Sequence, residues 1–344
     1  MRKLLNVLYV TNPNAYLSKD GDNVVILIEG KEAARVPAHN LEGIVCFGYM
    51  GASPKLMQMC CENNIGLSFV SENGRFLARV TGRISGNILL RHRQYALYEN
   101  EERSAAISKS IVLGKLINCR SVLRRFARDH DNLVTDEYVL HLKLLEDIIK
   151  DLQRYEAKDI NEVRGYEGIG SKYYFSCLDS LILSQKDGFY FRERSKHPPL
   201  DRMNALLSFV YVLIAHDVES AIETVGMDPQ AGFLHRNRPG RASLALDLME
   251  ELRPYLGDRF VLTLVNNHVV KATDFVIKEN GAVYLIPDVR KIIISAYQKR
   301  KKETVIHGYL DEKIEIGLIP YAQSLLMARH LRGDIDGYPP FIMR

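Results

Sequence analysis

Three segments that lie far apart in the chain carry side chains able to do chemistry. In the first, residues 165–175, Glu167 stands among small residues and just before a run of aromatic ones. Small neighbouring residues allow the start of a helix to pack closely against other elements. They also leave the Glu167 carboxylate uncovered in a concave part of the protein. The alternative is a glutamate in the first turn of a helix, where the helix dipole favours negative charge.

The second segment, residues 232–241, holds His235 ahead of three arginines and a Pro-Gly turn. Nearby positive charges disfavour the imidazolium form of histidine, and neutral imidazole is the form that binds metals. The arginines are candidates for binding phosphate, because the guanidinium fork fits phosphate oxygens; they are Arg236, Arg238 and Arg241. The alternative for His235 is an ordinary core or loop histidine.

The third segment, residues 243–254, combines an apolar stripe with three acids. Asp247, Glu250 and Glu251 follow one another at helical spacing, so Asp247 can share a helix face with either glutamate. Like charges one turn apart repel each other. Arg253, the upstream arginines or a divalent cation could compensate them. The alternative is an exposed acidic face.

A histidine and two or more carboxylates from separate helical segments form a ligand set suited to Mg²⁺ or Mn²⁺. Zinc is less favoured because no cysteine joins the set. A metal ion beside several arginines suits phosphate chemistry, because the ion neutralises a non-bridging oxygen and activates an attacking hydroxyl. This chemistry requires the three segments to converge in the fold.

The first part of the chain is predicted to consist mainly of strands. Residues 1 to about 95 are rich in β-branched and apolar runs separated by turn signals, among them an Asp-Gly turn at 19–22 and an Asn-Gly hairpin turn at 72–75. One helix interrupts the strands, with Ser53 as its cap and Pro54 in its first turn.

From about Leu97 onward, apolar residues recur at helical spacing. We expect the helix of the third segment to stop at about Pro254, and a single β-hairpin to be inserted at 275–285. The sequence therefore predicts an α+β protein, with a small β-rich domain at 1–95 and a larger helical domain at 96–344.

Positive charge is concentrated in one stretch of the chain. Residues 75–128 contain twelve basic and three acidic side chains, a net charge of +9, whereas the whole chain carries only +4. Such segregation attracts polyanions such as DNA, although ordinary surface charge is an equal alternative. The short run at 298–302 is a further candidate for contact with DNA.

Composition excludes several classes of protein. The most apolar stretch, residues 205–215, is about half the length needed to cross a bilayer, so no membrane partner is expected. The 5 cysteines lack the spacing of a zinc site and are an odd number, which argues against a disulfide framework. A reducing cytoplasm is the expected compartment.

With these motifs the sequence resembles the CRISPR-associated endonuclease and integrase family, the larger protein of the spacer-acquisition pair in bacterial CRISPR immunity. The resemblance spans nearly the whole chain. Four motifs in order carry it, at residues 166–175, 198–208, 232–235 and 243–254. The residues of these motifs are most similar to those of family members that accompany type I-C systems. One departure is Gly170 and Ser171, where many members have alanine-type residues.

The resemblance implies a site and partners that spacing alone does not show. It implies that Glu167, His235 and Glu250 bind the metal and that Asp247 is a supporting acid. It implies a homodimer formed through the β-rich domains. A dimer of a small adaptation partner protein would bridge two such dimers in a heterohexamer-type complex.

The predicted activity is that of a divalent-metal-dependent DNA endonuclease and integrase in the prokaryotic cytoplasm. The 3′-hydroxyl of a captured prespacer duplex would attack a phosphodiester at the CRISPR repeat, and water in its place would cut DNA. Arg236, Arg238 and Arg241 would contact DNA. The alternative is a non-catalytic DNA-binding scaffold. A metallohydrolase of small phosphorylated substrates is disfavoured, since a small ligand needs no extended cationic surface.

Overall fold

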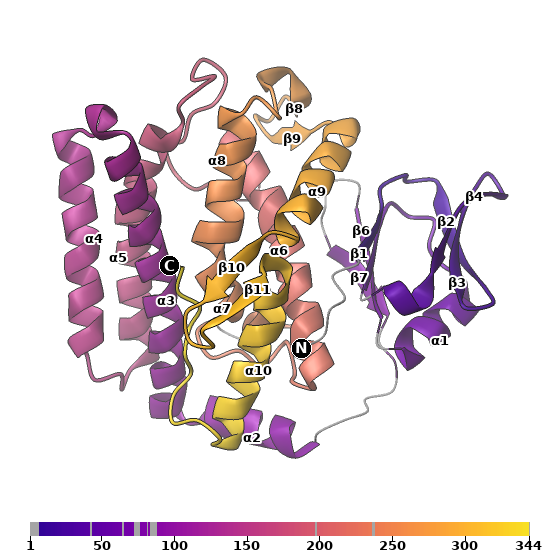
Figure 1. Ribbon diagram of the computed structural model, residues 1–344, viewed down its shortest axis with the longest axis horizontal. Coiled ribbons are helices and arrows are strands. Elements are labelled where there is room, and N and C mark those ends of the chain that lie inside the picture. Colours follow the sequence, from indigo (N-terminus) through magenta and orange to yellow (C-terminus); the bar gives the residue numbers. More distant parts are fainter. Residues whose placement is uncertain are drawn as a thin grey trace. The chain divides into compact units, whose positions relative to one another are not determined.

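The computed structural model describes residues 7–41, 43–63, 65–71, 76–80, 82, 88–196, 198–235 and 238–343 (Figure 1). The chain divides into two compact units. The first unit comprises Met1–Gly86 together with Ile286–Lys302, and the second comprises Asn87–Leu285 together with Glu303–Arg344. A β-rich region followed by a mostly helical one confirms the predicted α+β class.

Four strands of the first unit form a mixed sheet in the order β1-β5-β6-β7. Strands β1 (Val7–Val10), β5 (Gly43–Phe47) and β6 (Gly66–Val70) are parallel, and β7 (Phe76–Val80) is antiparallel to β6. All 5 residues of β5 are buried. A strand between two parallel neighbours has both faces covered, which explains its unbroken apolar run.

A second sheet of the first unit is the antiparallel meander β2 (Ala15–Asp20), β3 (Asn23–Ile28) and β4 (Lys31–Pro37). The predicted turn at 19–22 joins β2 to β3, and Gly21 there has a φ of 54°, which glycine adopts without steric cost. Strands β6 and β7 pair as the predicted hairpin requires. Residues 72–75 of its turn lie outside the described part of the chain.

Helix α1 (Pro54–Glu62) begins as predicted, because the Ser53 hydroxyl accepts a hydrogen bond from the Leu56 N–H at 3.3 Å. Leu56 is fully buried and packs into the core of the first unit. The centre of that core consists of apolar side chains from four strands and the helix: Leu17, Val24, Ile44, Leu56 and Leu67.

Helix α9 (Pro287–Lys301) belongs to the first unit and carries the basic run 298–302 at its end. Within this run Lys301 is only 3% exposed and lies over the Tyr297 ring at 5.7 Å. The run is therefore not a uniformly exposed cationic surface.

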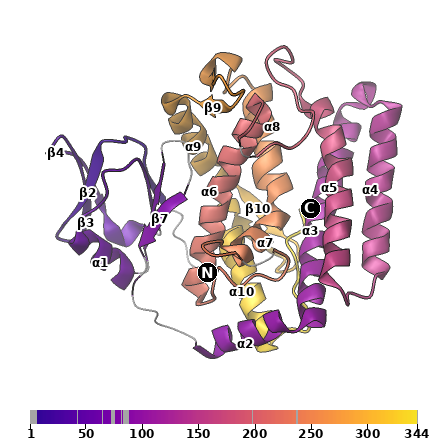
Figure 2. The same cartoon turned by 180° about the vertical axis from the view of Figure 1, so that it is seen from behind.

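The second unit is built from helices (Figures 1 and 2). They are α2 (Ile88–Glu99), α3 (Glu101–Asp129), α4 (Asp136–Arg154), α5 (Ile160–Leu178), α6 (Arg202–Val225), α7 (Ser243–Leu252), α8 (Arg259–Asn266) and α10 (Ile319–Arg332). Helical structure thus begins at Ile88, ahead of the predicted position near Leu97. Asn100 separates α2 from α3 by capping α3, its side chain accepting from the Arg103 N–H at 2.9 Å.

Helix α3 is the element on which the site is assembled. It packs against α4, α5 and α7, and α3, α4 and α5 lie side by side in both views (Figures 1 and 2). Its buried face is long and mostly apolar, and its polar residues include Lys115 and Asn118. Buried polar side chains need partners, and these two find them next to the predicted site.

Helix α6 is capped by Asp201, whose carboxylate accepts from the Asn204 N–H at 2.7 Å. The helix runs on to Val225, well beyond the apolar stretch 205–215. It is long and apolar enough to cross a membrane by length and composition. However, 61% of its most apolar window is buried inside the protein, which is the character of a core helix.

Helix α7 ends at Leu252, close to the predicted end at about Pro254. The chain does not enter a loop there, because the segment Arg253–Asp258 continues as a π-helix that leads directly into α8. Proline lacks the N–H that an α-helix needs, and the wider π turn lets the chain continue despite this loss. This continuation was not predicted.

The described residues of the helical region contain two β-hairpins, one more than predicted. The expected one pairs β8 (Phe275–Ile277) with β9 (Val283–Leu285). The other pairs β10 (Thr304–His307) with β11 (Glu312–Glu315). Their strands are only three or four residues long, which leaves little periodicity to detect in the sequence.

Candidate active site

The three predicted segments meet in the second unit around helix α3. Helix α5 carries Glu167, α7 carries Asp247 and Glu250, and the loop before α7 carries His235. The His235 Nε2 atom lies 3.8 Å from Glu250 Oε1. Glu167 and Glu250 each form an ion pair with the same ammonium group, that of Lys115 on α3.

Asp247 holds the histidine loop in place. Its Oδ2 atom accepts hydrogen bonds from the N–H groups of Phe233 and Leu234 at 2.5 and 2.9 Å. Its Oδ1 atom accepts from the N–H of His235 at 2.9 Å and lies 2.7 Å from Nδ1 of the same ring. Asp247 is fully buried, so its two oxygens are used entirely to position the loop.

This contact fixes the tautomer of His235. Because the Asp247 carboxylate is an acceptor, the ring proton lies on Nδ1, and the Nε2 lone pair is left facing Glu250. A histidine whose Nδ1–H donates to a carboxylate while Nε2 stays free is the arrangement found for metal-binding histidines.

The close approach of the loop to α7 depends on Gly232. A Cβ atom on this residue would lie 2.6 Å from the Ser243 carbonyl carbon and 2.8 Å from Asp247 Oδ2. Only glycine permits such contact, so the N–H groups that follow it can reach Asp247.

Neighbouring helices fix the same loop from the other side. The buried Gln94 side chain of α2 donates to the carbonyls of Asp228 and Ala231 at 2.8 and 2.9 Å. On α5, Arg164 Nε donates to the Leu234 carbonyl at 2.7 Å. The residue before His235 is therefore held by its N–H and by its carbonyl.

Glu250 is buried between two cations. Its side chain is 3% exposed; Oε1 lies 2.6 Å from Arg253, and Oε2 lies 2.7 Å from Lys115 Nζ. Burial by itself raises the pKa of Glu250, but Arg253 and Lys115 outweigh it and lower the pKa to about 2. Arg253 is thus the compensating residue that the sequence suggested.

Glu167 lies on the more open side of the cluster. Its side chain is 28% exposed and that of His235 is 21% exposed, against 3% for Glu250. Glu167 Oε1 pairs with Lys115 and accepts from the Ser171 hydroxyl at 2.9 Å. A ligand from solvent would therefore meet Glu167 and His235 first.

The site residues fit a hard divalent cation. Oε2 of Glu250 is buried and faces the Lys115 ammonium at 2.7 Å. That oxygen, the Nε2 lone pair of His235 and the Glu167 carboxylate are donors of the type that Mg²⁺ and Mn²⁺ accept. Within the described ranges, however, no three His, Cys, Asp or Glu side chains already form a metal cage, because Lys115 stands between the two glutamates.

One local expectation from the sequence is wrong, and two alternatives that the sequence left open are now decided. Glu167 stands in the middle of α5 (Ile160–Leu178), not at a helix start. The acids of the third segment are not an exposed face, since all three are buried. Glu251 points away from the site, because its carboxylate is bound by Tyr338, Gln323 and the Phe341 N–H.

The arginines predicted to contact DNA have different surroundings. Arg238 is exposed, and Arg241 is half-buried, with burial and the charge of Arg238 lowering its pKa. Arg236 lies outside the described residues. Both described arginines flank the histidine loop, and their role in DNA binding stays a prediction.

The basic stretch 75–128 is less uniform than its net charge suggests. Lys115 is buried in the site. Arg124 pairs with Glu146 at 2.5 Å, and Arg128 pairs with Asp129 at 2.9 Å. Arg93 and Arg103 are exposed and remain candidates for contact with polyanions.

The site roles of Lys115 and Arg164 were not predicted from the sequence. Lys115 is one of many cations in the basic stretch. The available signal was its place between Gly114 and Leu116 on a mostly apolar helix face, where a lysine requires a buried partner. Arg164 offered no signal, since its partner is a backbone carbonyl 70 positions away.

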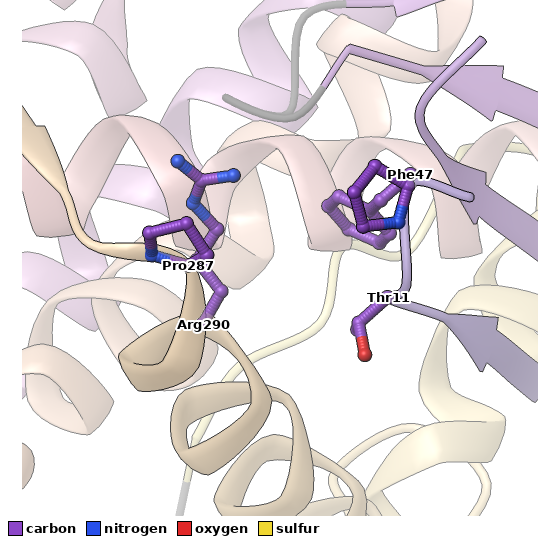
Figure 3. A pocket seen from close by; sticks show the side chains of 5 residues that line it. Thr11, Phe47, Pro287 and Arg290 are labelled. Carbon is purple, nitrogen blue, oxygen red and sulfur yellow. The ribbon is translucent and has the colours of Figure 1, made fainter. Parts of the chain in front are cut away.

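A small hollow in the first unit is unrelated to this chemistry. It is lined by Thr11, Pro13, Phe47, Pro287 and Arg290 (Figure 3). Its lining contains no carboxylate or histidine, so it offers no alternative metal site.

The order of a β-rich unit followed by a helical unit matches two solved structures. A casposase bound to an integration product superposes with a TM-score of 0.82 at 20% identity, covering 97% of this chain and 93% of that one. A Cas1 protein from Thermotoga maritima gives a TM-score of 0.80 at 23% identity, covering 95% and 97%. These likenesses establish the fold.

Sequence comparison establishes the family. The model of the family described as CRISPR associated protein Cas1 matches residues 8–299. A CRISPR-associated endonuclease Cas1 from Chlorobaculum tepidum is 47% identical over 345 residues, and one from Rhodospirillum rubrum is 46% identical over 347 residues; each comparison covers 100% of both chains. The chain belongs to the Cas1 family.

Proposed function

We propose that this chain is a divalent-metal-dependent DNA endonuclease and integrase of CRISPR adaptation. Relatives of nearly the same length are named as CRISPR-associated endonucleases. The observation that carries the proposal is the convergence of His235, Glu250 and Glu167 from three separate segments. Asp247 fixes the tautomer of His235.

Glu167, His235 and Glu250 would hold Mg²⁺ or Mn²⁺. When bound, such an ion supplies charge neutralisation at the scissile phosphate and helps to ionise the attacking hydroxyl. Asp247 keeps the proton of His235 on Nδ1, so that the ring stays oriented with Nε2 toward Glu250. Arg253 keeps Glu250 ionised at neutral pH, because it lowers the pKa of that carboxyl.

The reaction would be a transesterification. The 3′-hydroxyl of a prespacer attacks a phosphodiester of the CRISPR repeat, one P–O bond forms as another breaks, and no external energy source is required. With water as the attacking group, the same site cuts DNA. Arg238 and Arg241, which follow the histidine loop, would hold phosphate oxygens of the DNA.

The proposed partners are DNA, a second copy of the chain and a small adaptation protein. One structural neighbour is a Cas6-RT-Cas1–Cas2 complex, with a TM-score of 0.83. We propose that this chain forms a homodimer through its β-rich domain, 1–95, and that two dimers are bridged by the small protein. We also propose a type I-C system and the prokaryotic cytoplasm as its setting.

A strand-transfer assay tests the activity. His235→Ala and Glu250→Gln should each abolish integration into a repeat-containing plasmid in Mn²⁺ while leaving the circular dichroism spectrum unchanged. The exposed His92→Ala serves as the control and should react like the parent protein. Chelation of the metal should abolish both integration and cleavage.

Full activity of His235→Ala would remove His235 from the mechanism. DNA binding that is salt-sensitive and metal-independent, with no cleavage by the parent protein, would instead support the non-catalytic scaffold.

A further inference from the structure

Lys115 occupies the centre of the proposed metal site. Its side chain is 6% exposed, and its ammonium group contacts one carboxylate from α5 and one from α7, those of Glu167 and Glu250. A lysine buried this deeply needs partners of opposite charge, and Lys115 has two of them. Inside the site it therefore places a positive charge between the two carboxylates.

The two cations beside Glu250 differ in how firmly they are held. Arg253 is fixed, because its guanidinium lies over the Tyr211 ring at 4.9 Å and binds Glu250 Oε1 at 2.6 Å. Lys115 has a flexible four-carbon stem, and its ammonium is a compact point charge that contacts Glu250 Oε2 at 2.7 Å. Lys115 is thus the cation that can be exchanged for another.

We propose that Lys115 is an internal counter-ion that holds Glu167 and Glu250 together in the metal-free protein and is displaced when a divalent cation binds. The inference rests on the proposed function, because it assigns a role toward the same metal ions. Two carboxylates at one buried point repel each other without a cation between them. The lysine keeps the ligands assembled, and the metal ion must compete with it.

A purely structural ion pair makes the opposite prediction about metal affinity. If Lys115 only supported the architecture, its removal would loosen the ligands and weaken metal binding. If the Lys115 ammonium occupies the position that the metal ion would take, its removal takes away a competing positive charge. Metal binding then becomes tighter.

The test is Mn²⁺ titration of Lys115→Met by calorimetry, with thermal unfolding measured in chelator and in Mn²⁺. We expect Mn²⁺ to bind about tenfold more tightly than to the parent protein. The variant should unfold at a lower temperature in chelator, because the buried Glu250 and the partly exposed Glu167 lose the cation between them. Added Mn²⁺ should then raise its unfolding temperature by more than it raises that of the parent protein.

Lys109→Met is the matched control, because Lys109 lies on the same helix but donates only to the carbonyls of Gln153 and Tyr155. It should bind Mn²⁺ like the parent protein even if it is less stable. Lys115→Gln is a second variant, which keeps a polar group at the position should methionine prevent folding. It should also bind Mn²⁺ more tightly.

Equal or weaker Mn²⁺ binding by both Lys115 variants, with normal binding by the parent protein, would overturn the role of Lys115 and leave the proposed function standing. Binding of Mn²⁺ by neither the parent protein nor the variants would overturn both.

Discussion

At the scale of single residues, the site shows how environment gives neighbouring acids different roles. Asp247 and Glu250 stand one helical turn apart and are both buried. Asp247 meets three backbone N–H groups and a ring nitrogen, so it positions a loop. Glu250 meets two side-chain cations and the free nitrogen of His235, so it remains available to a metal ion.

The different roles of Asp247 and Glu250 predict which substitution weakens Mn²⁺ binding more. Glu250→Gln should weaken Mn²⁺ binding more than Asp247→Asn does, because only Glu250 offers an oxygen to the ion. Asp247→Asn should instead lower the free energy of unfolding by about 1–3 kcal/mol. The amide NH₂ of asparagine cannot accept a hydrogen bond, so it would leave a backbone N–H of the loop without its acceptor. Calorimetry and urea denaturation measure the two quantities.

Glu156→Gln is the control for this pair, because Glu156 is 82% exposed and should affect neither quantity. Weaker Mn²⁺ binding by Asp247→Asn than by Glu250→Gln would move the ligand assignment to Asp247.

At the scale of elements, the C-terminal segment 338–343 ties together the two helices that carry Lys115 and Glu250. Tyr338 and the Phe341 N–H both donate to Glu251 on α7 at 2.5 Å. Asn118 on α3 donates to the Phe341 carbonyl at 2.9 Å and accepts from the Met343 N–H at 2.8 Å. The C-terminus lies beside α3 in both views (Figures 1 and 2).

Glu251 makes this attachment sensitive to pH. Burial raises its pKa from the ordinary value of 4.5 to about 8, although hydrogen bonds from Tyr338, Phe341 and Gln323 oppose the change. The folded protein therefore binds a proton that the unfolded chain has lost between these two values. The stability that this proton contributes is fully present below pH 4.5 and is lost as pH rises toward about 8.

We expect Glu251→Gln to remove this part of the pH dependence, because glutamine stays neutral. Urea denaturation between about pH 5 and pH 9 should show the free energy of unfolding of the parent protein falling more steeply than that of the variant. Parallel curves would show that Glu251 does not change protonation on unfolding.

At the scale of the whole molecule, net charge is a poor guide to where DNA would bind. The chain carries only +4. Some cations of the basic stretch are paired with acids or used inside the site. Arg238 and Arg241 are better placed, because they flank the loop that holds His235.

The double variant Arg238→Ala, Arg241→Ala should bind duplex DNA more weakly and with a smaller dependence on salt. The slope of log affinity against log salt should fall by about 1 for each phosphate that the variant no longer binds. Fluorescence anisotropy at several salt concentrations measures this slope. Lys278→Ala, Lys313→Ala removes the same charge from exposed positions on the two hairpins and should change the slope less.

Local signals in the sequence determined much of the fold. The Ser53, Asn100 and Asp201 side chains cap helices because short polar groups satisfy the first free N–H groups. The turn at 19–22 follows from glycine at a positive φ. The hairpin β10–β11 and the π-helical continuation of α7 were missed, because neither has a periodic pattern long enough to be recognised.

The sequence by itself determined the three chemical segments and, through their order, the family resemblance. Only the tertiary structure decided how their side chains are used. Periodicity places Glu250 and Glu251 one position apart but does not say which one faces His235, since that depends on what packs against each side of α7. Nor does it show that Lys115 lies between the carboxylates, because such contacts join residues that are distant in the chain and adjacent only after folding.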